Sequence, residues 1–301
     1  MTGWRMAFAS VGILIGGAVI PGLAGSMGYA MAALAVTPLM IGAVWLSLWS
    51  TRKAPRIESA AQVNIAGMFG LVFANKAFVV LVLLYGVMTL AIAMITAGLP
   101  FAALYLIIDS GDTALSGAAA ALSTLSLMFA AFVIGSILSQ AGWVLLSNRV
   151  GKVGALIIGL SLYVGLLYAL NTQLPSVNVT AIAGMFVLAG FTNGAYQQIP
   201  WAMYPDLMDV TRRNSGVAIE GAFSAVWLFG QKLANAAAPA VLGLTLAAAG
   251  WQETTDGVVA QSDVALAALL NAITLIPAVI LIVAIIGLAA VYRPMAARVL
   301  A

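Results

Sequence analysis

The sequence predicts an all-α integral membrane protein, a helical bundle with about eight transmembrane helices. Three observations predict it. Of the 301 residues, 63% are hydrophobic and only 7% are charged, whereas soluble domains carry about 25% charged residues. The hydrophobic residues form long continuous runs, unlike the alternating segments of about 10 residues that build β-barrels. Lys and Arg gather in every second connection between these runs, which is typical of membrane-inserted helices.

The composition also excludes several classes of function. Twelve Lys and Arg with nine Asp and Glu cannot cover the surface of a soluble enzyme. The chain has neither Cys nor His, which rules out disulfide frameworks, thiol nucleophiles, zinc sites and histidine-based acid–base catalysis. A net charge of +3 without a dense basic cluster does not predict nucleic-acid binding. We therefore expect no enzyme activity and no cofactor, with a small solute and the lipid bilayer as partners.

Eight runs are long enough to cross a hydrocarbon core, which takes about 20 apolar residues. The first and fifth are the shortest and depend on flanking small residues to reach across. No signal peptide is indicated, because no cleavage site stands out from the Ala and Gly background. The expected spans are Met6–Leu23, Tyr29–Trp49, Ala77–Ile108, Leu115–Leu146, Val153–Leu170, Val179–Tyr204, Gly216–Ala249 and Val264–Tyr292.

The charged residues predict the orientation of these spans. Positive side chains resist translocation and stay in cytoplasmic loops. Eleven of the twelve basic residues lie at the termini or in every second loop, while the charged residues of the alternate loops are all acidic. The sequence thus predicts a multi-pass protein of the inner (cytoplasmic) membrane with both termini in the cytoplasm. The eleven bases are Arg5, Arg52, Lys53, Arg56, Lys76, Arg149, Lys152, Arg212, Arg213, Arg293 and Arg298, and the acids are Asp109, Asp112, Glu253, Asp256 and Asp263.

The segment Arg52–Lys76 differs from the spans. It is too polar at its start to cross a membrane, and its apolar residues recur at roughly helical spacing. This pattern predicts a cytoplasmic linker with an amphipathic helix on the membrane surface. The linker divides the chain into residues 1–50 with two spans, residues 51–76, and residues 77–301 with six spans.

The twelfth basic residue lies inside a span. Lys232 is near the middle of Gly216–Ala249, and an ionisable group at such depth indicates a functional site by default. Its ammonium group can face an aqueous cavity and bind solute or a carboxylate; alternatively, it is a buried Lys paired with helix carbonyls. Glu220 lies twelve residues earlier and about 120° around the helix. We therefore expect Glu220 to pair with Arg212 or Arg213 instead.

A second polar group lies in the preceding span. The stretch Tyr196–Trp201 places the amides Gln197 and Gln198 between aromatic residues. Sugar sites combine flat aromatic faces against C–H surfaces with amides that match hydroxyl groups. The alternative is amide pairing between helices beside an interfacial Trp.

Charged residues cluster in two loops near this stretch. Those after Pro205 predict a salt-bridge latch on an inner gate; the alternative is a solvated loop. The bases of the preceding loop can cap helix C-termini. The latch residues are Asp206, Asp209, Arg212 and Arg213, and the bases are Arg149 and Lys152.

The block from Pro200 to Lys232 is the most specific part of the sequence. Pro200–Asp209, Glu220–Phe223 and Phe229–Lys232 resemble the glycoside–pentoside–hexuronide:cation symporters, the melibiose-carrier (sodium:galactoside symporter) branch of the major facilitator superfamily. Asp206 stands fourteen residues before Glu220, and Lys232 stands twelve after it, at the spacing of that family.

The resemblance runs along nearly the whole chain. Trp4–Ala9, followed by Pro21, looks like the start of the family's fifth helix, and Arg149–Lys152 is similar to its loop between helices eight and nine. It implies a major-facilitator-type bundle equivalent to the last eight of twelve helices. It also implies cation-coupled symport of a glycoside or other sugar-like solute by alternating access.

The resemblance also implies roles for single residues. Arg5 and Lys232 line the sugar cavity from opposite halves. Gln197 stands where some carriers have an aromatic residue and Trp227 where some have an amide, a swap that leaves the particular sugar open. The candidate substrate-binding residues are Lys232, Arg5, Gln197, Gln198, Trp227 and Gln231, and the candidate gating residues are Asp206, Asp209, Arg212, Arg213, Glu220, Arg149 and Lys152.

The number of spans departs from that family, whose members have twelve. We therefore expect an N-terminally truncated symporter or a misplaced start of the reading frame, with the missing N-terminal segment as a partner. The absent helices carry the family's cation-binding acids, and no carboxylate lies mid-membrane here, so the site for the coupling Na+ or H+ is expected outside this chain. Two alternatives stay open: a family relative that carries a lipid-like or anionic solute, and a non-transporting membrane fragment or scaffold.

Overall fold

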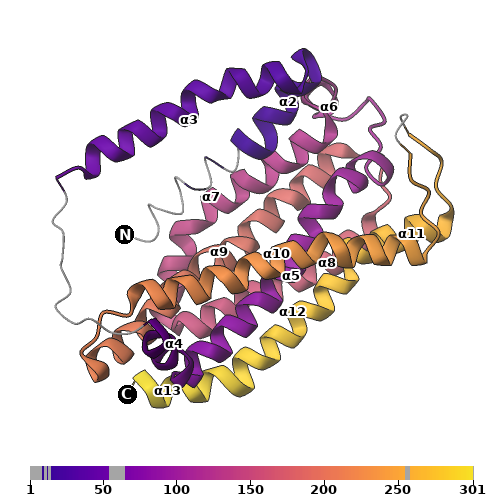
Figure 1. Ribbon diagram of the computed structural model, residues 1–301. Coiled ribbons are helices and arrows are strands. Elements are labelled where there is room, and N and C mark those ends of the chain that lie inside the picture. Colours follow the sequence, from indigo (N-terminus) through magenta and orange to yellow (C-terminus); the bar gives the residue numbers. More distant parts are fainter. Residues whose placement is uncertain (1–8, 10–11, 13–14, 54–64, 255–257, 301) are drawn as a thin grey trace.

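The computed structural model describes residues 9, 12, 15–53, 65–254 and 258–300, and helices dominate throughout (Figure 1). Among these residues no β-strand forms, and one isolated bridge joins Ile107 to Ser176. The predicted all-α membrane bundle is confirmed. The elements are η1 (Ile15–Val19), α2 (Ile20–Met27), α3 (Tyr29–Thr51), α4 (Ile65–Ala74), α5 (Lys76–Tyr105), α6 (Ser116–Leu122), α7 (Thr124–Val150), α8 (Lys152–Gln173), α9 (Val179–Ser215), α10 (Glu220–Ala248), α11 (Asp263–Ile273), α12 (Leu275–Gly287), η2 (Leu288–Tyr292) and α13 (Arg293–Leu300).

Six helical segments in the described part are long and apolar enough to cross a membrane. Helix α10 has 29 residues but is not one of the six, and the polar side chains of Gln231, Lys232 and Asn235 lie at its centre. The first predicted span, Met6–Leu23, lies partly outside the described residues. The six segments are Tyr29–Thr51, Lys76–Tyr105, Thr124–Val150, Lys152–Gln173, Val179–Ser215 and Asp263–Val299.

Two of the predicted runs contain a break. Leu115–Leu146 divides into α6 and α7 at Ser123, whose φ is +74°; its hydroxyl then accepts a hydrogen bond from the Ser126 amide and caps α7. Val264–Tyr292 divides at Thr274 into α11 and α12. Pro277 has no amide hydrogen to donate to the carbonyl of Ile273, so the helix ends there. The break at Thr274 lies inside one membrane-length segment, Asp263–Val299, whereas the segment Thr124–Val150 begins only after the break at Ser123.

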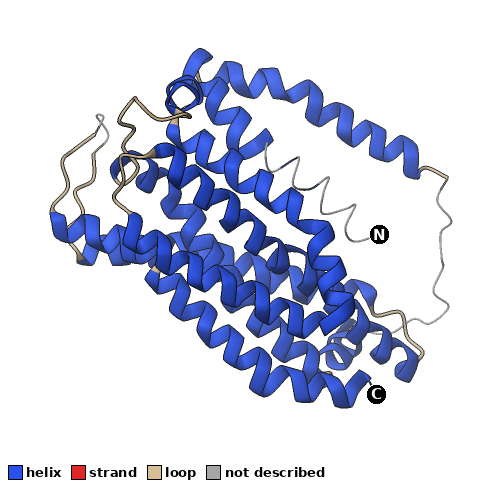
Figure 2. Cartoon of the chain, turned by 180° about the vertical axis from the view of Figure 1, so that it is seen from behind, coloured by secondary structure: helices blue, strands red, loops and turns tan. Residues whose placement is uncertain are grey.

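Helices α5 and α7–α12 lie side by side in one bundle, whereas α3 runs apart from it (Figures 1 and 2). Only 11% of the apolar core of α3 is buried, compared with 39–56% in the other membrane-length helices. Within the bundle, α7 and α9 approach most closely at two glycines. A Cβ atom at Gly135 would lie 1.9 Å from the Val187 carbonyl oxygen, and one at Gly190 only 1.7 Å from that of Phe132. Small residues therefore set this crossing, as in many membrane bundles.

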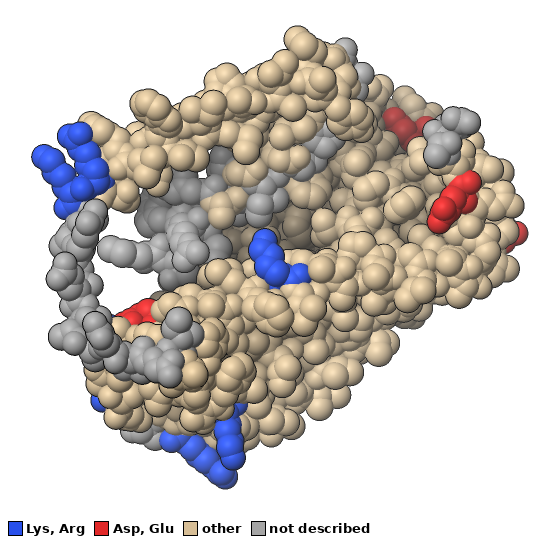
Figure 3. Space-filling model, in the orientation of Figure 1, with Lys and Arg blue, Asp and Glu red and all other residues tan. Residues whose placement is uncertain are grey.

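The two ends of the bundle carry opposite charge. At one end three loops meet: the Ile108 amide donates to the Ser176 carbonyl (2.9 Å), and the Tyr105 hydroxyl donates to the Val259 carbonyl (3.1 Å). The charged residues of these loops are acidic, and basic side chains gather at the opposite end (Figure 3). This arrangement is the one that the alternating charges predict. Which end faces the cytoplasm stays a prediction from the positive-inside rule.

The predicted linker contains a helix, α4, between α3 and α5. Val72 of α4 is buried while Phe73 is 56% exposed, and the helix consists of apolar residues and Gly alone, so the predicted polar face is not part of α4. Residues 54–64 of the linker lie outside the described part of the chain. Asn75 ends the linker and caps α5, because its side-chain oxygen accepts a hydrogen bond from the Phe78 amide (3.0 Å). The placement of α4 on the membrane surface, and the division into three parts, stay predictions.

Candidate solute-binding site

Polar side chains in the middle part of the bundle lie on α9 and α10 and on the adjacent faces of α5 and α7. We call this set the polar layer. It contains both amides of the Tyr196–Trp201 stretch and the mid-helix Lys predicted from the sequence. Its members are Tyr85, Thr89, Ser136, Asn193, Tyr196, Gln197, Gln198, Trp201, Trp227, Gln231 and Lys232.

Lys232 is the charged member of this layer. It lies about 18 Å along α10 from Glu220, at about 1.5 Å per residue, and therefore near the middle of the helix. Its side chain is exposed and makes no ion pair or hydrogen bond with any described residue. Lys232 therefore does not pair with helix carbonyls, and its ammonium group is available to a ligand.

Aromatic rings form a continuous stack across three helices. Tyr85 of α5 lies between Trp227 of α10, with ring centroids 4.2 Å apart and planes at 12°, and Tyr196 of α9, at 5.6 Å and 23°. Tyr204 of α9 stacks on Trp227 at 4.8 Å. Trp227 is completely buried, so in this structure it does not border an open cavity. The stack fixes the spacing between α5, α9 and α10.

The hydroxyl group of Tyr85 ties the same three helices together. It accepts hydrogen bonds from Gln231 Nε2 (2.9 Å) and from Trp201 Nε1 (3.1 Å). One turn further along α5, the hydroxyls of Thr89 and Tyr196 lie 2.8 Å apart. Thr89 donates to the Tyr85 carbonyl (2.7 Å), so in their contact Tyr196 is the donor. These contacts hold Gln231 next to Lys232 at a defined place on α10.

The two amides of α9 face different neighbours. The hydroxyl of Ser136 on α7 donates to Gln197 Oε1 (3.2 Å), and Gln198 is buried. Gln197 also lines an internal cavity of about 200 Å³ between α5, α7, α8, α9 and α11, together with Asn193 and Tyr196. The other walls of this cavity are mainly apolar. It is smaller than the usual ligand pocket of about 300–1,000 Å³, so the bundle is nearly closed around these groups.

Four buried polar atoms have no hydrogen-bond partner in the described part of the chain. They are Gln140 Oε1, Asn193 Oδ1, Gln198 Oε1 and Trp227 Nε1, and all of them lie on α7, α9 or α10. Three acceptors and one donor are thus left without partners inside the bundle. Such atoms are rare in folded proteins and call for a physical explanation.

Two ion pairs join helices at the basic end. Lys152, the first residue of α8, lies 2.6 Å from Asp206 of α9 and also donates to the Ala202 carbonyl (2.8 Å). Arg212 lies 3.0 Å from Glu220, which confirms the expected pairing of that glutamate. The second pair spans the turn at Gly216, whose φ of +68° reverses the chain between α9 and α10.

The structure brings together only some of the candidate residues. Gln231 and Trp227 both contact Tyr85, whereas Gln197 accepts its hydrogen bond from Ser136 of α7. Arg5 lies outside the described residues. Of the candidate gating residues, Asp209, Arg213 and Arg149 form no ion pair with any described residue.

Sequence reasoning missed the α5 and α7 side of the site. Tyr85 and Thr89 are four residues apart in an otherwise apolar run, so they share one helix face. That spacing of polar groups within a span was the available signal. Ser136 and Asn193 carry no such local signal, because single small polar residues are common in membrane helices.

Comparisons with known proteins agree with this architecture. The model of the MFS/sugar transport protein family matches residues 1–293. A 106-residue stretch, 35% of this chain, is 33% identical to an uncharacterized symporter of Synechocystis sp., and it spans only 20% of that protein. Because the family model covers nearly the entire chain, the chain belongs to the MFS/sugar transport protein family and is a multi-pass membrane protein of a transporter family.

Proposed function

We propose that this protein acts in the cation-coupled symport of a glycoside or other sugar-like solute by alternating access, and that the polar layer binds the solute. The observation that carries the proposal is the set of buried polar atoms without a partner among the described residues, three of which, on Asn193, Gln198 and Trp227, belong to this layer. Each such atom costs about 1–3 kcal/mol. A solute rich in hydroxyl groups supplies both donors and acceptors to these atoms and so removes that cost.

The members of the layer suit different parts of a sugar. The amides of Gln197, Gln198 and Gln231 can each donate and accept hydrogen bonds to hydroxyl groups. The ring of Tyr196, which lines the internal cavity, offers an aromatic surface to C–H groups. Lys232 adds a charged donor, which strengthens hydrogen bonds to a neutral hydroxyl or to a carboxylate. The resemblance to the melibiose carriers adds Arg5 as a partner of Lys232 in this role.

Access to the site requires movement in this account. Trp227 and Gln198 are buried here, so solute reaches them only after α9 or α10 shifts. Pro200 and Pro205 lie inside the continuous helix α9, and Pro239 lies inside α10; each proline removes one backbone hydrogen bond of its helix and so marks a place where the helix can bend. We propose that the Lys152–Asp206 and Arg212–Glu220 pairs hold one state of the gate at the basic end. The coupling ion, Na+ or H+, is assigned to no described residue.

The proposal is tested by solute binding to the purified chain in lipid nanodiscs, using a panel of neutral glycosides and one hexuronide. Lys232→Gln removes the charge at the site, and we expect it to weaken binding about 10- to 100-fold, the loss of one hydrogen bond to a charged group. Lys232→Arg should retain more affinity than Lys232→Gln. Leu244→Ala is the matched control, because Leu244 is 73% exposed on the same helix. Unchanged binding by Lys232→Gln contradicts the proposed site.

A second candidate, transport of an anionic solute, is favoured by one observation. Lys232 has no acidic partner among the described residues, so a carboxylate on the solute can neutralise it. The same panel separates the two: if the solute is anionic, the hexuronide binds more tightly than the matching neutral glycoside, and Lys232→Gln abolishes that difference. Equal binding of both by the unmodified protein favours the neutral sugar.

A further inference from the structure

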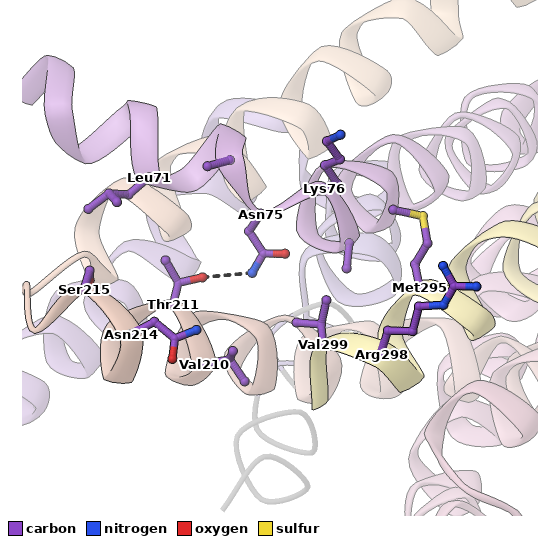
Figure 4. A pocket seen from close by; sticks show the side chains of 12 residues that line it. Leu71, Asn75, Lys76, Val210, Thr211, Asn214, Ser215, Met295, Arg298 and Val299 are labelled. Atoms are coloured by element: carbon purple, nitrogen blue, oxygen red, sulfur yellow. Dashed lines mark hydrogen bonds between the residues drawn. The ribbon is translucent and has the colours of Figure 1, made fainter. Parts of the chain in front are cut away.

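A pocket at the basic end of the bundle takes no part in the proposed solute site. It lies between the start of α5, the last turns of α9 and the C-terminal helix α13, and it has a volume of about 570 Å³ (Figure 4). These elements are far apart in the sequence and meet only in the fold. The lining residues are Leu71, Ala74, Asn75, Lys76, Ala77, Val210, Thr211, Asn214, Ser215, Met295, Arg298 and Val299.

Two cations border this pocket. Lys76 begins α5 and Arg298 lies in α13, and Figure 4 shows them at the same side of the pocket with Met295 between them. Both side chains are exposed, and neither forms an ion pair or hydrogen bond with any residue in the described ranges. The lining contains no acidic residue. Two like charges held at one cavity without a counter-charge favour an anionic ligand.

Two polar residues of the lining lie away from the two cations. Asn214 and Ser215 lie at the end of α9, at the opposite side of the pocket from Arg298 (Figure 4). An Arg guanidinium presents paired N–H groups that match the oxygens of a phosphate. Lys76 supplies a compact positive charge at the N-terminus of α5, where the helix dipole also favours an anion. The donor set therefore fits a phosphate group.

Asn75 fixes the shape of the pocket. Its Nδ2 donates to Thr211 Oγ1 (2.9 Å) and to the Leu207 carbonyl (3.2 Å), while its Oδ1 caps α5 at Phe78. The two bonds from Nδ2 tie the start of α5 to α9. Because Asn75 makes these bonds, the adjacent Lys76 is held beside α9 without a hydrogen bond from its own side chain. Its ammonium group is therefore available to a ligand.

The remaining walls favour a ligand with an apolar part. Leu71, Val210, Met295 and Val299 form an apolar surface next to the two cations. The pocket lies at the ends of α5 and α9, which are long and apolar enough to cross a membrane; the ends of helices that span a bilayer lie near the lipid headgroups. Basic pockets between membrane helices on the cytoplasmic side bind acidic lipid headgroups, and each Lys or Arg near an anionic surface contributes about 1 kcal/mol. A free phosphate ion has no part that fits the apolar wall.

We propose that this pocket binds the headgroup of an acidic phospholipid, with Lys76 and Arg298 at the phosphate and the glycerol backbone along Met295 and Val299. The site holds α13 and α9 to the start of α5. It is independent of the solute and its transport.

The test measures lipid binding to the purified full chain by native mass spectrometry, with phosphatidylglycerol and phosphatidylcholine of identical acyl chains. We expect phosphatidylglycerol to bind at least 10-fold more tightly, and Lys76→Gln with Arg298→Gln to abolish this preference. The charge-retaining pair Lys76→Arg with Arg298→Lys should keep it, which shows that the loss does not come from misfolding. Arg293→Gln is the matched control, because Arg293 is exposed on the same helix about 140° from Arg298 and does not line the pocket.

Three results overturn the proposal. Equal binding of the two lipids shows that charge is not recognised. An equal loss with Arg293→Gln shows that net positive charge at this end, rather than the pocket, attracts the lipid. Displacement of phosphatidylglycerol by millimolar inorganic phosphate, added in a separate arm at constant ionic strength, identifies a free phosphate as the ligand and contradicts the lipid assignment.

Discussion

The polar layer and the contact between α8 and α12 lie in the same bundle and have opposite chemistry. Helix α12 contains no polar side chain, and Leu281 and Ala284 pack with Leu156 and Leu160 of α8 in one buried cluster. The polar layer is equally buried at Trp227 and Tyr85, yet it contains hydrogen-bonded and unpartnered polar groups. Polar groups inside a membrane span cost free energy and are usually functional. The difference indicates that the apolar contact provides stability and that the polar layer is retained for binding.

The largest expected effect is a difference in thiol labelling between cysteines introduced at the two ends of the bundle. The chain has no Cys, so a single introduced cysteine reports its own position. We expect Asp112→Cys to react with an impermeant thiol reagent added outside intact cells and Asn214→Cys to react only after the cells are opened, because basic loops stay in the cytoplasm. External labelling at position 214 refutes the assigned orientation.

The second prediction concerns a substitution that weakens only the apolar contact between α8 and α12. Leu281→Ala removes a side chain with no exposed surface and should lower the free energy of unfolding by about 2–5 kcal/mol. Solute affinity should stay within about two-fold of the unmodified protein. Reversible unfolding in mixed micelles measures the first quantity, and equilibrium binding measures the second. A large loss of affinity shows that the two regions are not separable.

The third prediction concerns the Tyr85 hydroxyl, which connects α5, α9 and α10 within the polar layer. Tyr85→Phe keeps the aromatic stack but leaves the N–H groups of Gln231 and Trp201 without the Tyr85 hydroxyl. Hydrogen bonds between membrane helices contribute about 0.6 kcal/mol on average, so the loss of two should destabilise the protein by about 1 kcal/mol. Affinity should fall several-fold because Gln231 is no longer held in place. Thr245→Val on α10 is a matched control, since Thr245 bonds only the carbonyl of its own helix at Val241.

The smallest expected effect on stability is at the gate. The side chains of Lys152 and Asp206 are 39% and 40% exposed, and ion pairs exposed to this degree contribute about 0–1 kcal/mol. Asp206→Asn should therefore leave stability nearly unchanged while altering the rate at which the gate opens. Solute exchange across vesicles measures that rate. A loss of stability above about 2 kcal/mol assigns the pair a structural role instead.

Much of the fold follows from the sequence, for definite physical reasons. The length of the apolar runs and the alternation of charge predict the bundle, because lipid leaves no other way to satisfy the backbone. The breaks at Ser123 and Thr274 were harder to predict. Ser123 adopts a positive φ that its residue type does not indicate, whereas Pro277 did indicate the second break.

The sequence predicted only some residues of the candidate site. Lys232, Gln231 and the amides of α9 stand out because polar groups are costly within a span. The contact of Tyr85 with Gln231 joins residues 146 positions apart, and no local pattern predicts which faces of α5 and α10 meet. The pocket between Lys76 and Arg298 depends on the same kind of long-range contact.

The most direct test of the central claim is the thermal stabilisation produced by bound solute. A ligand at 100 times its Kd stabilises the folded state by about 2.7 kcal/mol. Using the tightest-binding solute of the panel, we predict the same stabilisation for the unmodified protein and for Leu281→Ala, and none for Gln231→Leu at the same solute concentration. Full stabilisation of Gln231→Leu, or its loss in Leu281→Ala alone, contradicts the assignment of solute binding to the polar layer.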